Sequence, residues 1–374
     1  MISVEHYFAP GRVNLIGEHI DYNGGVVLPA ALSLGICAGV RLRSDGVVRV
    51  RSDNEAGCVE VDLAKPVVYD ARHGWANYPK GVVAYLQKDG FILSGCDIVY
   101  RGDLPVGAGL SSSAAIEVLT AYLFLYPKMA DGIDRAYLAR LCQRVENEYI
   151  GVGCGIMDQF AVANGRANHA ILLDCESLQH EYVPVSLGNY SLVIINTGKK
   201  RALGESRYNE RRAECQEALK IIQRHRDVPN LCQATLEDAN RWIDDPILLK
   251  RARHVISEHL RTIEASRQLA AGNLGEFGRL LTASHKSLKE DYEVSGFELD
   301  TVVALALASN SCLGARMTGA GFGGCAIALV SKDDRERFQN FVGSTYTKRT
   351  GLRPEFYVTE IGDGVRRIPS RAFS

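Results

Sequence analysis

The sequence predicts an α+β protein folded into two lobes. Its 374 residues exceed the usual size of one hydrophobic core, so a chain of this length is expected to divide into two lobes around a cleft. Strand-like and helix-like segments mix throughout, and no internal repeat or low-complexity linker separates them. Turn residues gather at 165–170, so we expect an N-terminal lobe of residues 1–167 and a C-terminal lobe of residues 168–374.

The predicted strands are β-branched runs bounded by glycine or charged residues, at residues 26–43, 47–50 and 97–100. Helices are predicted where apolar residues recur with helical periodicity, at residues 114–126, 134–149, 209–225, 248–271 and 274–288. The apolar stripe at residues 299–308 is expected in a core.

Charge and composition exclude several classes of protein. The chain has 43 Lys and Arg against 44 Asp and Glu, so it offers no electrostatic footprint for nucleic acid or an anionic membrane. No apolar run reaches membrane-spanning length, and the first residues lack the basic and apolar regions of a secretory leader. The ten cysteines are scattered without a Cys-x-x-Cys pair, which is typical of reduced thiols. We therefore expect a cytoplasmic protein whose partners are small molecules.

The first informative motif, residues 9–25, places Arg12, Glu18, His19 and Asp21 among glycines. Carboxylates and an imidazole suit sugar hydroxyls, glycines let the backbone approach a ligand, and an arginine suits phosphate. The alternative interpretation is a solvated turn.

The second motif, residues 104–117, runs glycines and three consecutive serines into a predicted helix. Such a loop directs unpaired backbone N–H groups and a positive helix end at an anion, which indicates polyphosphate binding. The alternative is an ordinary serine N-cap, although one serine would suffice for that. The Gly-x-x-x-x-Gly-Lys-Ser/Thr loop is absent, so any kinase here is of another kind.

The third motif has glycines at Gly319, Gly321 and Gly324, in the spacing of a dinucleotide-binding fingerprint. Such a fingerprint opens a helix, whereas the apolar run at 325–330 indicates a strand after these glycines. We reject nicotinamide binding on this ground. The glycines are expected to form a loop beside the phosphate-binding loop, closing the cleft, and a tight hairpin turn is compatible with that role.

Segments 11–25, 105–115 and 316–329 resemble the three motifs of the small-molecule kinases that include galactokinase, homoserine kinase, mevalonate kinase and phosphomevalonate kinase. The first, Gly-Arg-Val-Asn-Leu-Ile-Gly-Glu-His-Ile-Asp-Tyr-Asn-Gly-Gly, is similar to that of galactokinases and their nearest sugar-kinase relatives. The likeness covers almost the whole chain, since it continues at residues 75–78, 154–160, 206–212 and 285–296.

The resemblance implies a two-lobed small-molecule kinase fold with mixed and antiparallel sheets and an active site in the cleft between the lobes. It implies ATP-dependent phosphorylation of α-D-galactose at the 1-hydroxyl, with Mg²⁺, in a protein that we expect to be monomeric. One alternative is a related sugar 1-kinase acting on N-acetylgalactosamine, galacturonate or arabinose. Another is a non-catalytic regulator that binds galactose and ATP, but such relatives lack part of the Ser-Ser-Ser-Ala run that is intact here.

For catalysis, the resemblance implies that Asp158 is the aspartate near the reacting hydroxyl. Arg12 is implied to pair either with Asp158 or with the transferring phosphate. A carboxylate is the residue type that can accept the hydroxyl proton. The alternative for Asp158 is a turn-capping role.

For the sugar, the resemblance implies contacts from Glu18, His19, Asp21, Gly155, Asp158 and Tyr208. Asp21 and Tyr208 are the candidates that distinguish the axial 4-hydroxyl of galactose from the equatorial one of glucose.

For the metal, it implies Ser113 and Glu146, with Glu148 as the competitor of Glu146. One hydroxyl and one carboxylate suffice, because Mg²⁺ also takes phosphate oxygens and water. Trp75 and Tyr78, implied to contact adenine, would without the resemblance be assigned to the core. The residues implied to bind ATP are Ser52, Trp75, Tyr78, Gly107, Ala108, Gly109, Leu110, Ser111, Ser112 and Ser113.

Overall fold

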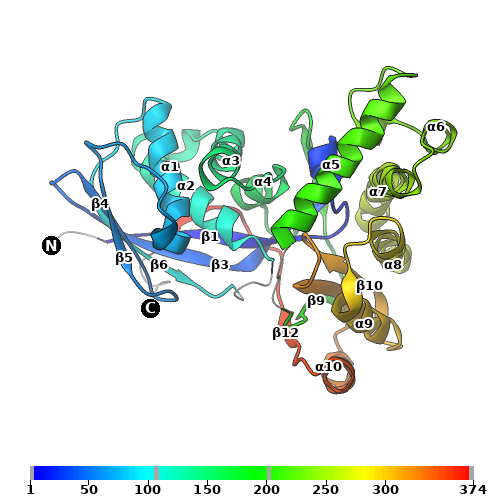
Figure 1. Ribbon diagram of the computed structural model, residues 1–374. Coiled ribbons are helices and arrows are strands. Elements are labelled where there is room, and N and C mark those ends of the chain that lie inside the picture. Colours follow the sequence, from blue (N-terminus) through cyan, green and yellow to red (C-terminus); the bar gives the residue numbers. More distant parts are fainter. Residues whose placement is uncertain (1–3, 105–108, 200–203, 370–374) are drawn as a thin grey trace.

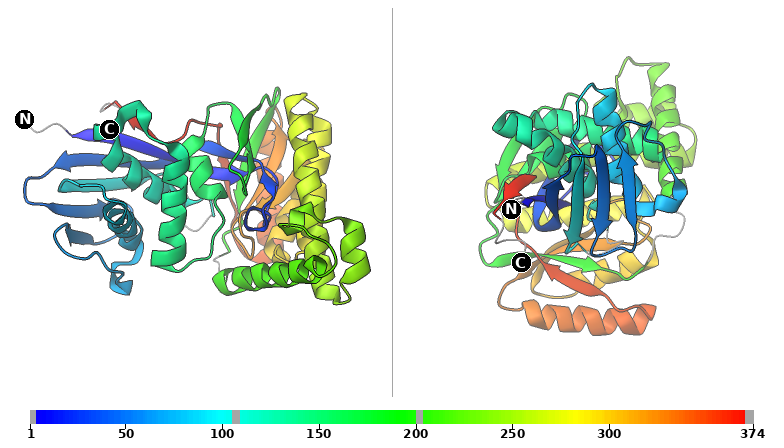
Figure 2. Two further views of the ribbon diagram at one scale, coloured as in Figure 1. Left: turned by 90° about the horizontal axis from the view of Figure 1, so that it is seen from above. Right: turned by 90° about the vertical axis from the view of Figure 1, so that its left-hand side faces the viewer.

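The computed structural model describes residues 4–104, 109–199 and 204–369. Within them the chain forms an elongated α+β molecule, with the helices of its first half and those of its second half toward opposite ends (Figure 2). The predicted fold class is therefore confirmed.

The first sheet has the strand order β13-β1-β3-β6-β4-β5. Only β4 and β6 pair in parallel among these neighbours. The strands are β1 (Glu5–Asn14), β3 (Pro29–Leu42), β4 (Val47–Ser52), β5 (Cys58–Asp62), β6 (Cys96–Gly102) and β13 (Arg366–Ile368).

Four helices cover one face of this sheet (Figure 1). They are α1 (Asn77–Lys88), α2 (Ser112–Met129), α3 (Arg135–Arg144) and α4 (Met157–Asn164). Residues 114–125 of α2 are all buried, because this run is apolar around the whole helix apart from Glu117 and Thr120. The helix predicted at 134–149 changes character at Val145, where a π-helical turn (Val145–Ile150) replaces α3.

The second sheet is antiparallel, in the order β10-β11-β9-β12. Its strands are β9 (Tyr190–Asn196), β10 (Cys312–Thr318), β11 (Cys325–Ser331) and β12 (Glu355–Val358). The hairpin of β10 and β11 encloses the third glycine motif, so the strand predicted after those glycines is confirmed. The accompanying helices are α5 (Gly204–Gln223), α6 (Leu236–Trp242), α7 (Pro246–Ala270), α8 (Leu274–Glu290), α9 (Gly296–Leu307) and α10 (Arg335–Thr350).

A third sheet, in the order β2-β7-β8, contains β2 (Val26–Val27), β7 (His169–Asp174) and β8 (His180–Pro184). The single strand predicted at 26–43 is therefore wrong in one respect. The chain leaves β2 at Leu28 and enters β3 at Pro29, so the two strands belong to different sheets. Pro29 has no backbone N–H to donate, which suits the first position of the new strand.

The two halves of the chain contact each other at several points. β13 pairs with β1, so the last strand returns to the sheet of the first. One core cluster joins Val13 and Leu28 to Phe277 and Ile327. The lobe boundary at residues 167 and 168 stays a prediction.

No helix among the described residues combines the length and the apolar character that crossing a bilayer requires. No disulfide joins the cysteines of the described residues.

Candidate active site

Arg12 and Asp158 form a bidentate ion pair between β1 and α4. The Nε atom of Arg12 donates to Oδ1 of Asp158 and the second guanidinium nitrogen donates to Oδ2, both at 2.8 Å. The Arg12 side chain is 5% exposed, whereas that of Asp158 is 30% exposed. A buried cation therefore orients the carboxylate, while part of the carboxylate remains accessible from solvent.

Ser111 adds a third hydrogen bond to this carboxylate. Its hydroxyl donates to Oδ2 of Asp158 at 2.5 Å and does not cap α2, although Ser111 occupies the N-cap position of that helix. The interpretation of Ser111 as an ordinary serine cap is therefore wrong. Its backbone has a φ of 62°, a left-handed conformation that turns the chain into α2.

The rest of the predicted phosphate loop is only partly described. Arg12 donates to the carbonyl of Gly109 at 2.7 Å, and its backbone N–H donates to the carbonyl of Leu110 at 3.1 Å. Ser112 is exposed in the first turn of α2. Gly107 and Ala108 lie outside the described residues.

Asp21 and Gly155 are in close contact. A Cβ atom added to Gly155 would lie 1.9 Å from Oδ2 of Asp21, so only glycine fits beside this carboxylate. Burial, followed by the negative charge of Asp158, raises the pKa of Asp21 to about 7. The arrangement brings two predicted sugar contacts together beside the predicted catalytic aspartate.

Glu18 ties the first motif to the third. Its Oε1 atom accepts from the N–H of Gly319 at 2.6 Å and from the hydroxyl of Thr318 at 3.1 Å. The fully buried Arg316 guanidinium lies 3.5 Å from the same oxygen. The glycine loop was expected beside the phosphate-binding loop, but these contacts join it to the first motif, and residues 105–108 lie outside the description. The predicted sugar contact of Glu18 stays a prediction.

His19 uses both ring nitrogens inside the protein. Nδ1 lies 2.8 Å from the Tyr22 hydroxyl and Nε2 lies 3.1 Å from the carbonyl oxygen of Ala320. Burial, followed by the positive electrostatic influence of His254, lowers the pKa of His19 to about 3, so the ring is neutral. Its predicted contact with a sugar hydroxyl stays a prediction, and making it through a ring nitrogen requires exchanging one of these bonds.

Tyr208 projects from α5 toward the same residues. Its ring centroid lies 5.5 Å from that of His19 and 5.2 Å from that of Tyr22. Burial, followed by the charge of Asp21, raises the pKa of Tyr208, so its hydroxyl stays protonated. Tyr208 is thus a neutral donor and acceptor near Asp21.

The two candidate metal ligands also lie together. The Ser113 hydroxyl lies beside the Glu146 carboxylate and favours its charged form, but burial has the larger effect and raises the pKa of Glu146. Glu146 is 6% exposed, and its Oε1 atom is buried without a hydrogen-bond partner. Glu148, in contrast, accepts from the Tyr85 hydroxyl at 2.8 Å. A hydroxyl beside a carboxylate with an unpaired oxygen fits Mg²⁺, which also takes phosphate oxygens and water.

This site differs from an all-protein metal cage. No group of three or more His, Cys, Asp or Glu side chains suited to a metal ion occurs in the described parts of the chain.

The remaining predicted nucleotide contacts lie in or beside the first sheet. Trp75 and Tyr78 are half-buried and pack against its core, and the Trp75 ring meets that of Tyr100 edge to face at 6.0 Å. Ser52 accepts from the N–H of Asn54 at 3.1 Å. The core interpretation of the two aromatic residues is thus partly correct, and their contact with adenine stays a prediction.

Two residues of α7 that the sequence analysis did not identify hold the backbone of the first motif. His254 Nε2 donates to the carbonyl of Glu18 at 3.1 Å, and Glu258 accepts from the N–H of Gly17 at 3.1 Å. They are four residues apart, so they share one helix face. In the sequence they appear only as a histidine and a glutamate four residues apart within the helix predicted at 248–271.

Comparisons with known proteins add three matches to family models. The GHMP kinases N terminal domain matches residues 77–166, the galactokinase galactose-binding signature matches residues 4–42, and the GHMP kinases C terminal region matches residues 265–348.

Similar whole proteins are also known. A galactokinase of Enterococcus faecalis is 50% identical over 370 residues, covering 97% of this chain and 95% of its own. A galactokinase of Clostridium tetani is 48% identical over 370 residues, covering 98% of this chain and 94% of its own. The crystal structure of Lactococcus lactis galactokinase complexed with galactose is 46% identical, with a TM-score of 0.94 over 98% of this chain and 95% of that one. Methanococcus jannaschii mevalonate kinase, 17% identical with a TM-score of 0.65 over 99% of each chain, shares the fold.

Proposed function

Since the chain belongs to the galactokinase family of the GHMP kinases, we propose that it transfers the γ-phosphoryl group of ATP to the 1-hydroxyl of α-D-galactose, giving galactose 1-phosphate and ADP. The observation that carries the proposal is that Arg12 and Ser111 orient the Asp158 carboxylate beside the N-terminus of α2. A helix N-terminus favours phosphate, and a carboxylate beside it can receive a proton.

In the proposed reaction the 1-hydroxyl oxygen attacks the γ-phosphorus while the bond from phosphorus to the ADP oxygen breaks. The hydroxyl proton passes to Asp158. Its Oδ1 atom accepts one hydrogen bond from Arg12, whereas Oδ2 accepts from both Arg12 and Ser111. Because a carboxylate oxygen has two lone pairs, Oδ1 has the greater remaining capacity, and we assign the proton to it. Arg12 orients the carboxylate and adds positive charge near the transferring group.

For sugar recognition we propose Asp21, Tyr208, the backbone at Gly155 and the second oxygen of Glu18. A buried partner that meets the axial 4-hydroxyl is left unpaired by the equatorial epimer, which is the strong form of discrimination. The close contact of Asp21 with Gly155 supports this assignment, because it leaves the carboxylate little freedom to follow a misplaced hydroxyl. We propose that His19 acts mainly by shaping this site.

For the nucleotide we propose that Ser113 and Glu146 hold Mg²⁺, with Trp75, Tyr78 and Ser52 near the base. The ion would neutralise phosphate charge during transfer. The buried, unpaired oxygen of Glu146 beside the Ser113 hydroxyl supports the metal assignment. The further ATP contacts proposed are the glycine and serine run at residues 107–113. We also propose a cytoplasmic monomer.

The test is a coupled assay of ADP release with Mg²⁺ and ATP. Galactose, glucose, N-acetylgalactosamine, galacturonate and arabinose are compared, and ³¹P and ¹³C NMR locate the phosphate on the product. We expect the highest kcat/KM for galactose and phosphate on its C1 oxygen. A higher kcat/KM for another of these sugars would replace the proposed substrate, and no sugar-dependent ADP release would contradict the proposal.

A further inference from the structure

A row of hydrogen-bonding groups runs behind the first motif, from α5 to the third glycine loop. The Cys215 thiol lies 3.0 Å from the Tyr292 hydroxyl, which lies 2.8 Å from the Tyr22 hydroxyl. The Tyr22 hydroxyl in turn lies 2.8 Å from Nδ1 of His19, whose Nε2 faces the carbonyl of Ala320. Tyr292 and Cys215 are fully buried and His19 is 3% exposed, so water does not compete freely for these bonds.

The direction of every bond in the row follows from its last member. A backbone carbonyl only accepts, so Nε2 of His19 carries a hydrogen. In the neutral ring Nδ1 then has none and must accept from the Tyr22 hydroxyl. The Tyr22 oxygen consequently accepts from Tyr292, and the Tyr292 oxygen accepts from the Cys215 thiol. Each group donates once along the row, so each hydroxyl orientation determines the next.

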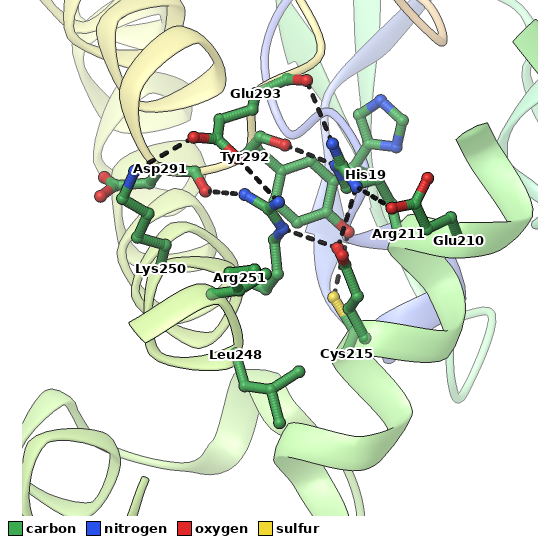
Figure 3. Close-up of polar contacts among 12 residues, drawn as sticks. His19, Glu210, Arg211, Cys215, Leu248, Lys250, Arg251, Asp291, Tyr292 and Glu293 are labelled. Atoms are coloured by element: carbon green, nitrogen blue, oxygen red, sulfur yellow. Dashed lines mark hydrogen bonds and ion pairs between the residues drawn. The ribbon is translucent and has the colours of Figure 1, made fainter. Parts of the chain in front are cut away.

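Charged residues hold Tyr292 in place at the far end of the row. Arg211 of α5 donates to the carbonyl of Tyr292 at 2.8 Å, and Arg251 of α7 donates to the carbonyl of Asp291 at 2.6 Å. Arg251 also pairs with Glu293 at 2.8 Å. Figure 3 shows Tyr292 enclosed by these arginines, with Cys215 on one side and His19 nearby. Residues of α5 and α7 therefore hold the backbone that carries the Tyr292 side chain.

The near end of the row meets the proposed sugar site. The Tyr22 ring packs edge to face against Tyr208, with centroids 5.2 Å apart and an angle of 70° between the rings. The His19 ring lies 5.5 Å from Tyr208 as well. The orientation of Tyr22 therefore limits where the Tyr208 hydroxyl can lie.

We propose that Tyr22 and Tyr292 are positioning residues for the sugar, which act through their hydroxyl groups by fixing the His19 ring and, through ring contact, Tyr208. The inference rests on the proposed function and deepens it, because it names what orients the sugar-binding face. Neither hydroxyl touches the reacting atoms. Both are separated from them by His19 or Tyr208, so the expected effect is on sugar affinity.

Tyrosine-to-phenylalanine variants test the role of each hydroxyl while they retain the ring. Tyr22→Phe leaves Nδ1 of His19 buried without a donor, so we expect the KM for galactose to rise roughly tenfold. Tyr292→Phe leaves the bond from Tyr22 to His19 possible but removes its orientation, so a smaller rise of about threefold is expected. In both variants kcat and the KM for MgATP should stay within about twofold of the wild type.

A spectroscopic measurement separates positioning from a general loss of structure. The ¹⁵N chemical shifts of the His19 ring report which nitrogen carries the hydrogen, and comparison with His19→Gln assigns the signals. We expect a neutral ring with hydrogen on Nε2 in the wild type, and a changed Nδ1 shift in Tyr22→Phe. This measurement needs no substrate, so it tests the row of bonds even if the proposed reaction is not found.

The matched control is Tyr7→Phe, which removes one hydroxyl bond from a buried ring of β1, where Tyr7 donates to Glu5 at 2.6 Å. It should change neither the KM for galactose nor the His19 signals. If Tyr22→Phe unfolds, Tyr292→Phe alone decides the proposal by the same two readouts. In a folded variant, an unchanged galactose KM or unchanged His19 shifts would overturn it, as would equal effects in the Tyr7→Phe control.

Discussion

Replacing Gly155 by alanine should push the Asp21 carboxylate out of the proposed sugar site. The added Cβ would lie 1.9 Å from Oδ2, 2.4 Å from Cγ and 3.1 Å from Cβ of Asp21. The φ of Gly155 is outside the left-handed region, so alanine adds no backbone strain there. The perturbation is therefore a local steric one aimed at a single side chain.

The size of the effect follows from that overlap. Oδ2 must withdraw by about 1.5 Å to restore an ordinary contact of 3.4 Å. Asp21 begins a short 3-10 turn (Asp21–Asn23) after the fully buried Ile20, so most of the movement falls on its side chain. A misplacement of about 1 Å in a site can cost about a hundredfold in rate, so we expect kcat/KM for galactose to fall by about that factor.

The assay is steady-state kinetics with galactose and MgATP varied separately. Gly275→Ala is the control, because its Cβ would meet nothing within 4 Å and its backbone is helical. It should leave kcat/KM unchanged and stability equal or slightly higher. A Gly155→Ala enzyme that keeps more than a tenth of the wild-type kcat/KM for galactose, or that loses affinity for MgATP instead, would refute the assignment of Asp21 to the sugar site.

Three further predictions concern charge, metal and specificity. Burial and the nearby Asp158 carboxylate raise the pKa of Asp21 from 3.8 to about 7, so the folded state holds this proton more tightly and Asp21 costs stability as pH rises through that range. The free energy of unfolding of Asp21→Asn, measured in urea, should therefore increase relative to that of the wild type between about pH 4 and pH 7. A difference between the two free energies that does not change with pH would contradict this. Glu146→Gln should raise the Mg²⁺ concentration needed for activity and weaken MgATP binding in calorimetry with little change in galactose affinity, while Glu148→Gln should not; the reverse order would move the metal to Glu148. Tyr208→Phe should lower kcat/KM for galactose several-fold more than for glucose, and equal losses would remove Tyr208 from recognition of the 4-hydroxyl.

Local patterns in the sequence predicted the elements better than their pairing. The apolar run of α2 and the strand β11 after the third glycine motif both followed from short-range composition. The change of sheet at Leu28 and the return of β13 to β1 did not, because each depends on partners far along the chain. The π-helical turn that carries Glu146 has the same apolar periodicity as the helix before it, so periodicity alone could not reveal it.

For the site, too, the sequence could predict some contacts and not others. A resemblance of motifs could suggest that Arg12 meets Asp158 across 146 positions, and the structure has that contact. It could not show that the Ser111 hydroxyl donates to the Asp158 carboxylate and does not cap α2. Nor could it show that both ring nitrogens of His19 form hydrogen bonds within the protein. Those outcomes depend on side-chain directions at left-handed backbone positions, where φ is 62° for Ser111 and 64° for His19.

The most direct test of the proposed mechanism is Asp158→Asn, assayed for turnover and for galactose binding on the same preparation. Asparagine retains the size of the side chain but removes its charge and its capacity to take the hydroxyl proton. We expect kcat to fall by roughly a hundredfold or more while the Kd for galactose, measured by calorimetry, changes by no more than a few-fold. Thermal unfolding must show a cooperative transition, because the Arg12 ion pair is weakened as well. A folded variant that binds galactose and keeps more than a tenth of the wild-type kcat would contradict the assignment of proton transfer to Asp158.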